Sequence, residues 1–117
     1  MFTYPDTVTM SSTGSASEKQ HHSMGVYRIT NMTRSGRPVW QSTVREDNYL
    51  FYNDIYWIVS NELSNNLAAI KSKKKGLILL PIRGWQYSIA NNGLEDDTTL
   101  TVTGKNIIFL LEFHLFP

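Results

Sequence analysis

The sequence predicts an all-β domain at residues 25–103, a small antiparallel sandwich or barrel of about seven short strands. Apolar residues occur in short runs interrupted by Gly, Pro, Asn and Asp, which is typical of strands joined by turns. No stretch carries a convincing amphipathic helical period. Residues 98–103 (TTLTVT) are rich in β-branched side chains, which are stiff and favour extended backbone.

The N-terminal residues 1–24 are expected to form a flexible linker. Residues 10–24 (MSSTGSASEKQHHSM) are dominated by Ser, Gly and polar side chains, with almost nothing to bury. Residues 1–17 contain neither a basic start nor a continuous apolar stretch, so they do not resemble a secretory signal. We therefore place the domain boundary near Gly25.

In the first half of the domain, the sequence predicts four strands. Gly25–Thr30 alternates between its two faces, and Val39–Val44 follows a connection at Asn31–Pro38 that contains a Ser-Gly pair. Tyr49–Tyr52 and Ile55–Ser60 are separated by an Asn-Asp pair, and these two residue types suit the tight turn of a hairpin. In the connection, Asn31 begins the triplet Asn-Met-Thr, a formal acceptor for N-glycosylation.

The second half predicts shorter strands. The expected extended segments are Leu67–Lys71, Leu77–Ile82, Trp85–Ala90 and Thr98–Thr103, with a turn at Asn91–Gly93. Residues 61–66 are the one place where a helical turn is expected. Residues 104–117 are predicted to be an apolar tail or an extra strand, and their apolar runs fall short of the roughly 20 residues of a membrane-spanning helix.

Composition limits the classes of partner. A formal net charge of +1 is too small to create the positive field that nucleic acid or anionic lipid requires, so no nucleic-acid partner is expected. The lysines of residues 71–75 are interpreted as a solvated hairpin tip, since a membrane-surface role needs more charge than one turn supplies. The chain has no cysteine, and hence no disulfide or thiolate site.

No catalytic or metal-binding motif is present in the sequence. Residues 95–97 (Glu-Asp-Asp) lack the spacing of a calcium loop, and His21, His22 and His114 lack the spacing of a zinc helix. The sequence contains no GxSxG, phosphate-loop or HExxH pattern. We therefore expect a protein that is not an enzyme and holds no metal and no cofactor.

Aromatic side chains occur in each of the better predicted strands. Most are expected to form the core, because each buried ring removes about 150–250 Å² from water. Alternation along the strands also allows some rings to be exposed, and exposed rings bind sugars or form protein-binding hot spots. The candidate ligand-binding residues are Tyr52, Tyr56, Trp57 and Arg37.

Six short segments recur in a fixed order: Gly25-Val26-Tyr27, Gly36–Trp40, Tyr49–Tyr52, Trp57-Ile58-Val59, Gly84–Tyr87 and Leu100-Thr101-Val102. This pattern resembles an uncharacterised module of marine invertebrate and protist proteins, and it covers residues 25–103. The resemblance implies a non-catalytic extracellular or cell-surface module, used for binding or adhesion. Gly36 and Gly84 are expected where the chain bends, and the Trp and Tyr residues between the sheets.

Two functions remain open at this point. The first is a binding or adhesion module that recognises a carbohydrate or protein through exposed aromatics and loops. The second is a structural spacer within a larger repeat assembly, with its aromatics wholly internal. The number of solvent-exposed rings distinguishes these two hypotheses.

Overall fold

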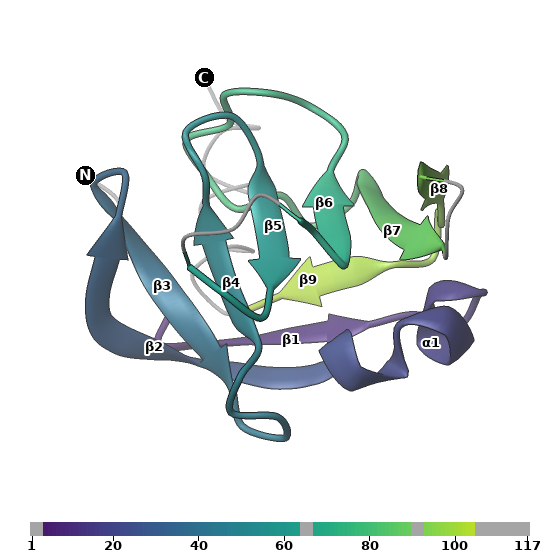
Figure 1. The fold of residues 1–117 in the computed structure, drawn as a ribbon, viewed down its shortest axis with the longest axis horizontal. Coiled ribbons are helices and arrows are strands. Elements are labelled where there is room, and N and C mark those ends of the chain that lie inside the picture. The colour runs from purple at the N-terminus through teal and green to yellow at the C-terminus, as the bar shows by residue number, and fades with distance from the viewer. Residues whose placement is uncertain (1–3, 64–66, 90–92, 105–117) are drawn as a thin grey trace, which may run out of the picture.

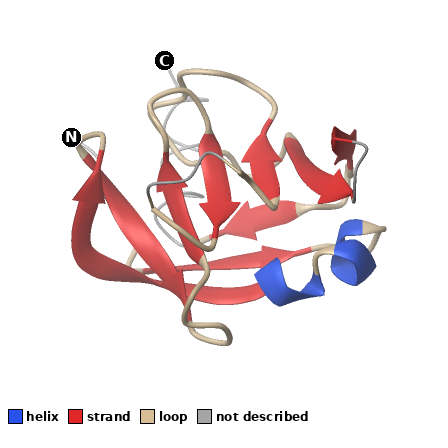
Figure 2. Cartoon of the chain, in the orientation of Figure 1, coloured by secondary structure: helices blue, strands red, loops and turns tan. Residues whose placement is uncertain are grey.

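The chain folds into a single curled antiparallel sheet, seen in a computed structural model that describes residues 4–63, 67–89 and 93–104 (Figure 1). Among the described residues, strand dominates and helix is confined to one short region, which confirms the all-β prediction (Figure 2). The sheet has nine strands, where about seven were expected. The elements are β1 (Thr7–Ser11), α1 (Ala16–Lys19), η1 (His21–Ser23), β2 (Gly25–Arg34), β3 (Arg37–Ser42), β4 (Tyr49–Tyr52), β5 (Trp57–Ser60), β6 (Ile70–Ser72), β7 (Trp85–Ile89), β8 (Gly93–Asp96) and β9 (Thr101–Thr103).

The strand order is β8-β7-β6-β5-β4-β3-β2-β1-β9, so all neighbours except β1 and β9 are consecutive in the chain. β1 pairs with β2 on one side and with β9 on the other. Figure 1 shows β1, in purple, beside β9, in yellow-green. The sheet curls until β9 reaches the segment before β7, where the Val102 N–H donates to the Ile82 carbonyl at 2.9 Å. A half-barrel results, with an inner face and an outer face.

The inner face is packed with aromatic side chains. Trp40, Trp57, Trp85 and Tyr27 are almost wholly buried there, together with aliphatic residues from β1 and β9. Each indole N–H donates to a backbone carbonyl outside the strands: Trp40 to Pro5 at 2.9 Å, Trp57 to Leu77 at 3.0 Å and Trp85 to Pro81 at 3.1 Å. The predicted aromatic core is confirmed, and the tryptophans also tether three irregular segments.

The outer face of β3, β4 and β5 carries a second apolar cluster. Val39, Phe51 and Ile58 lie next to each other in the register and are fully buried. Tyr49 and Tyr56 pack beside them and are half-buried. Both faces of these strands are therefore covered, so the expectation that alternation leaves some rings exposed is wrong for the described residues.

Residues 4–24 belong to the fold, which corrects the prediction of a flexible linker for residues 1–24. β1 alternates between exposed Thr and Ser and the buried side chains of Val8 and Met10. Its polar side chains face solvent, and their number concealed the period of two that marks a strand. The Ser-rich stretch that follows is held by hydrogen bonds and the single buried Ala16, so it needs little apolar surface.

Asp97 fixes the start of the helical region. Its carboxylate accepts hydrogen bonds from the Ser12 hydroxyl (2.7 Å), the Ala16 N–H (3.0 Å) and both the N–H and hydroxyl of Thr99 (2.9 and 2.6 Å). A Cβ at Gly14 would lie 2.8 and 2.9 Å from the two carboxylate oxygens, so only glycine allows this close approach. Residues 12–19 are thereby anchored to the segment between β8 and β9.

Other local predictions have mixed outcomes. The hairpin at residues 49–60 is confirmed, since the Asn53 side chain accepts from the N–H groups of Ile55 and Tyr56, and Asp54 takes a φ of 84°. Gly36 and Gly84 have φ of 74° and 85°, as expected at bends. The predicted strand at residues 77–82 is an irregular segment instead, and β8 was not anticipated.

The glycosylation candidate Asn31 is exposed, but it lies within β2 and not in a loop. β2 runs on through an irregular register between Ile29 and Thr33 to the turn at Ser35 and Gly36. Some predictions fall at least partly outside the described residues. They include the helical turn expected at residues 61–66, of which 64–66 are not described, the turn expected at 91–93, of which 91 and 92 are not described, and the tail beyond Gly104.

Candidate functional site

Three of the four candidate ligand-binding residues come together, but they form an internal structural cluster. The Arg37 guanidinium lies 3.6 Å from the ring centre of Tyr52 and 5.8 Å from that of Trp57. Tyr52 is 6% exposed and Trp57 is wholly buried. Because Arg37 Nη1 and Trp57 Nε1 both donate to the Leu77 carbonyl at 3.0 Å, this cluster closes one end of the core and offers no ring to a ligand.

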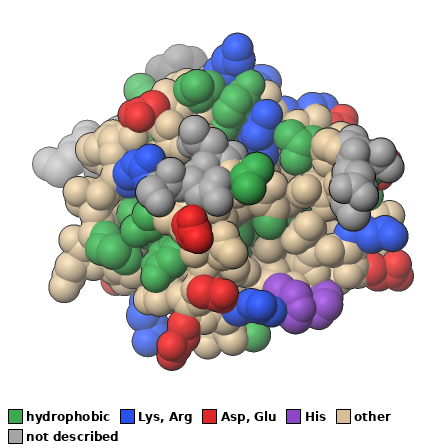
Figure 3. Space-filling model, viewed as in Figure 1, with side chains coloured by type: hydrophobic (Ala, Val, Ile, Leu, Met, Phe, Trp, Pro, Cys, Tyr) green, Lys and Arg blue, Asp and Glu red, His purple; other side chains and the backbone are tan. Residues whose placement is uncertain are grey.

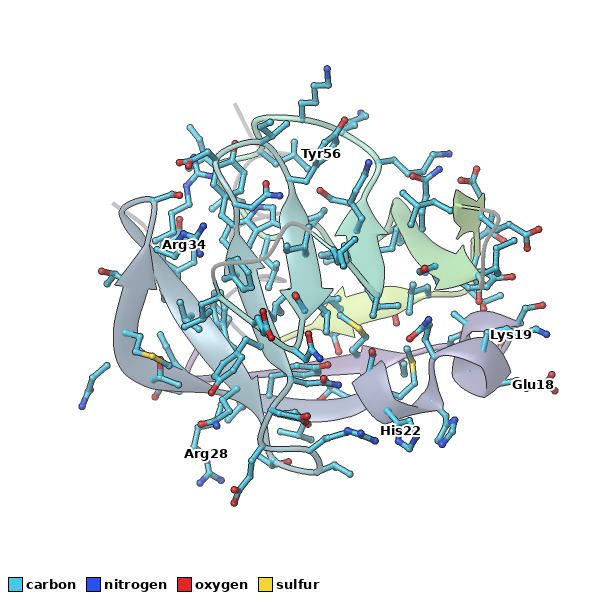
Figure 4. The ribbon with its side chains drawn as sticks, in the orientation of Figure 1. Glu18, Lys19, His22, Arg28, Arg34 and Tyr56 are labelled. Carbon is cyan, nitrogen blue, oxygen red and sulfur yellow. The ribbon has the colours of Figure 1, made fainter. Side chains whose placement is uncertain are left out.

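Tyr56, the fourth candidate, lies apart from this cluster on the outer face of the sheet (Figure 4). It is half-buried, and the Lys71 ammonium sits 4.0 Å from its ring centre. One face of the ring is therefore occupied by a cation from the same molecule. Tyr56 is therefore only partly available to a ligand.

An open cleft lies at the opposite end of the sheet, where η1, the β3–β4 loop and the β5–β6 connection meet. It is called the polar cleft below, after the polar side chains that line part of it. Its volume is about 450 Å³. Its apolar lining comes from Ala68, Ala69 and the exposed Leu67. The walls carry amide, hydroxyl, imidazole and guanidinium groups, from Gln20, His22, Arg45, Asn48, Ser60 and Asn61.

The helical wall of the polar cleft is held by hydrogen bonds to the sheet. The buried Tyr27 hydroxyl donates to the Ser23 carbonyl at 2.6 Å, and the Asn48 amide donates to the His22 carbonyl at 2.9 Å. The Gln20 amide donates to the Ser88 carbonyl of β7 at 2.8 Å. These three bonds position η1 over the ends of β5, β6 and β7.

The loop wall is an ordered turn. The Ser42 hydroxyl accepts from the N–H groups of Val44 (3.1 Å) and Arg45 (3.0 Å), so the chain reverses immediately after β3. The Asn48 N–H donates to the Arg45 carbonyl at 2.9 Å and closes the turn. Arg45 is thereby placed at the mouth of the cleft, with its side chain exposed.

Two charged groups and an imidazole set the electrostatics of the cleft. Arg45 and Asp47 form an ion pair of 3.3 Å whose side chains are 45% and 60% exposed, so solvent screens most of their attraction. Partial desolvation lowers the pKa of His22. The charges of Arg45 and of His21, whose ring lies tilted beside that of His22, lower this pKa further, while Asp47 raises it. His22 is therefore mainly neutral at pH 7 and can donate and accept hydrogen bonds. Figure 3 shows the two histidines in purple, with basic and acidic side chains beside them.

Sequence reasoning missed this cleft because Gln20 and His22 had been assigned to a linker. The one signal that could have placed them in the domain is the alternation of Val8 and Met10 upstream. That alternation, with a buried residue at every second position, marks residues 7–11 as a strand. If residues 7–11 pair with the sheet, residues 12–24 must connect them to the next strand and therefore also lie against the domain.

A second groove crosses β2 and β3 and has a volume of about 520 Å³. Arg28 and Gln41 are cross-strand neighbours in it, and Thr30 and Glu46 complete its rim. The Gln41 amide is already engaged with the Glu46 carbonyl at 2.7 Å. This groove lies on the sheet itself and not between loops.

Within the described ranges, no three His, Asp or Glu side chains gather closely enough to hold a metal ion. In the same part of the chain, no helix has the length and apolar character needed to cross a membrane. Comparison with protein-family models, curated proteins and solved structures found no match.

Proposed function

We propose that this protein is a non-catalytic binding module that holds a saccharide in the polar cleft. The observation that carries the proposal is the convergence of Gln20, His22, Arg45 and Asn61 from separate segments onto one open hollow. Its volume falls within the range of small-molecule sites, about 300–1,000 Å³. Loops on a rigid β scaffold are a common location for recognition.

A saccharide matches the chemistry of this cleft, which combines polar groups with apolar surface. Side-chain amides and a neutral imidazole can each donate and accept, which suits sugar hydroxyls that do the same. The small apolar side chains of Ala68 and Ala69 in the lining can contact the C–H face of a sugar ring. The proposal assigns binding and not catalysis, with the neutral imidazole of His22 serving as a hydrogen-bond partner.

The experiment is a glycan array, followed by calorimetric titration of the best binders with wild type and variants. Arg45→Ala and Asn61→Ala should each weaken binding by about tenfold, which corresponds to about 1.4 kcal/mol. Arg28→Ala is the matched control, since Arg28 is an exposed arginine of the other groove. Loss of binding in Arg28→Ala alone would move the site to that groove, and an array without binders would refute the saccharide.

A structural spacer is the second candidate, and one specific observation favours it. Among the described aromatic side chains, none is exposed: the tryptophans are buried, and Tyr4, Tyr49 and Tyr56 are half-buried. A spacer needs no exposed ring, and the absence of one in the described residues is consistent with that role. An empty glycan array, combined with a higher melting temperature when two copies are joined in tandem, would support the spacer and contradict the binding module.

A further inference from the structure

Two loops lie side by side at the end of the sheet opposite the polar cleft. They are residues 53–56, between β4 and β5, and residues 73–84, between β6 and β7 (Figure 1). The Gly76 N–H donates to the Ile55 carbonyl at 2.8 Å, and the Lys73 N–H donates to the Gly84 carbonyl at 2.8 Å. These two loops, called the basic end below, therefore form one connected surface.

The basic end presents two large aliphatic side chains to solvent. Ile55 is 48% exposed and Ile78 is 59% exposed. The backbone beneath both is fixed, because Asn53 Oδ1 accepts from the Ile55 N–H at 3.1 Å and the Tyr4 hydroxyl donates to the Ile78 carbonyl at 3.0 Å. Exposure of these isoleucines is thus built into the loops and does not arise from a loose chain.

Positive charge is concentrated on the loop that carries Ile78. Residues 71–84 contain five basic side chains and no acidic one, although the whole chain has a formal charge of only +1. Lys74, Lys75 and Arg83 are exposed, and within the described residues only Lys73 of this loop forms an ion pair, at 2.7 Å with Asp96. Asp54 is the one acidic side chain of the neighbouring loop. Figure 3 shows hydrophobic and basic side chains adjacent at this end.

We propose that the basic end docks on the surface of a bilayer containing anionic phospholipid. Ile55 and Ile78 enter the boundary between headgroups and acyl chains, while Lys74, Lys75 and Arg83 contact lipid phosphates. The isoleucines favour a bilayer over a sulfated polysaccharide, since a polysaccharide offers no apolar phase to receive them. The positive charge is concentrated on one of the two loops, residues 73–84, although the whole chain is nearly neutral.

The polar cleft stays open in this orientation. Adjacent hairpin loops alternate between the two ends of a sheet, so the β3–β4 and β5–β6 loops that line the cleft point away from the basic end. Figure 4 shows the separation, with Tyr56 at one end and His22 at the other. Bilayer docking therefore does not depend on the proposed saccharide binding, and either can fail alone.

The test is flotation of the full chain with vesicles of phosphatidylcholine alone or with about 30% phosphatidylserine, in low and high salt. We expect binding to the anionic vesicles only, with a loss of at least tenfold in high salt. The paired variants Lys74→Glu with Lys75→Glu, and Ile55→Ser with Ile78→Ser, should each reduce binding at least tenfold. Thermal melting of each variant verifies that it is folded.

Two matched controls isolate the surface. Lys19→Glu reverses a charge on α1, and Val44→Ser removes an aliphatic side chain that is 74% exposed on the β3–β4 loop. Both should float as wild type does. The proposal is overturned if the protein binds anionic and neutral vesicles equally, or if the control variants lose as much vesicle binding as the paired variants. It is also overturned if the protein binds heparin in a lysine-dependent way and binds no vesicle.

Discussion

The carboxylate of Asp97 accepts a 3.0 Å hydrogen bond from the backbone N–H of Ala16, which lies 81 residues earlier in the chain. One side chain near the C-terminal end of the domain thus fixes the first turn of α1. The chain continues from α1 into η1, which supplies one wall of the polar cleft. The stability of the domain and the shape of the cleft are therefore coupled through this carboxylate.

Asp97→Asn should destabilise the domain at pH 7. Burial alone would raise the pKa of Asp97, but hydrogen bonds from Thr99, Ser12 and Ala16 hold it at about 2, below its ordinary value of 3.8. At about 1.4 kcal/mol per pKa unit, the ionised carboxylate contributes about 2 kcal/mol. Urea denaturation at pH 7 measures the loss.

The pH dependence has a definite sign. The pKa of Asp97 is lower in the folded state, so its contribution is complete above about pH 4 and disappears as the pH falls toward 2. Between these pH values, the free energy of unfolding of wild type should therefore fall by about 2 kcal/mol more than that of Asp97→Asn. Asp54→Asn, at an exposed turn, is the control and should follow wild type. Parallel curves for wild type and Asp97→Asn would contradict the assignment.

Gly14→Ala should destabilise the domain by about 1–3 kcal/mol through overpacking. The added Cβ would lie 2.8 Å from one oxygen of Asp97. If that contact is the cause, the double variant with Asp97→Ala should be more stable than the sum of the two single effects predicts. Strictly additive free energies of unfolding would show that Gly14 acts in another way.

Trp85→Ala should lower the free energy of unfolding by about 3–5 kcal/mol, because the ring is 1% exposed in the core. Trp85→Phe retains much of the volume and removes the N–H that donates to Pro81, so it also measures the cost of that lost bond. Val44→Ala, on the surface, should stay within about 0.5 kcal/mol of wild type. An unchanged melting temperature for Trp85→Ala would exclude a core role.

Arg37→Ala should reduce stability by about 1–3 kcal/mol and leave ligand binding unchanged. The substitution removes the guanidinium from the face of Tyr52 and from the Leu77 carbonyl. Arg37→Lys retains the charge but loses the planar stacking, and should fall between wild type and Arg37→Ala. A stable Arg37→Ala protein that fails to bind glycans would restore Arg37 to the ligand site.

The sequence was informative where apolar periodicity was strong. The hairpin at residues 49–60 and the tryptophan core follow from alternation and from the turn chemistry of Asn53 and Asp54. β1 was missed because Thr and Ser occupy every exposed position, so only Val8 and Met10 show that it is a strand. β8 was missed for a related reason, since Glu95 and Asp96 are exposed on an edge.

The candidate site was predicted less well, because tertiary contacts decide which aromatic rings are exposed. Tyr52 and Trp57 have ordinary strand positions, and only the folded chain shows Arg37 and Leu77 covering them. The polar cleft assembles from segments far apart in the sequence, and no local pattern joins Gln20 to Asn61. The charge of the basic end was visible as a lysine run, but its exposed isoleucines were not.

The pairing of Thr9 with Thr103 has a consequence for synthesis on the ribosome. Translation makes β1 first and β9 last, so β1 has an unsatisfied edge until nearly the whole domain has emerged. Such an edge can pair with other nascent chains. Messages truncated before the codon for Thr101 should therefore yield aggregated product, even though they encode every tryptophan of the core.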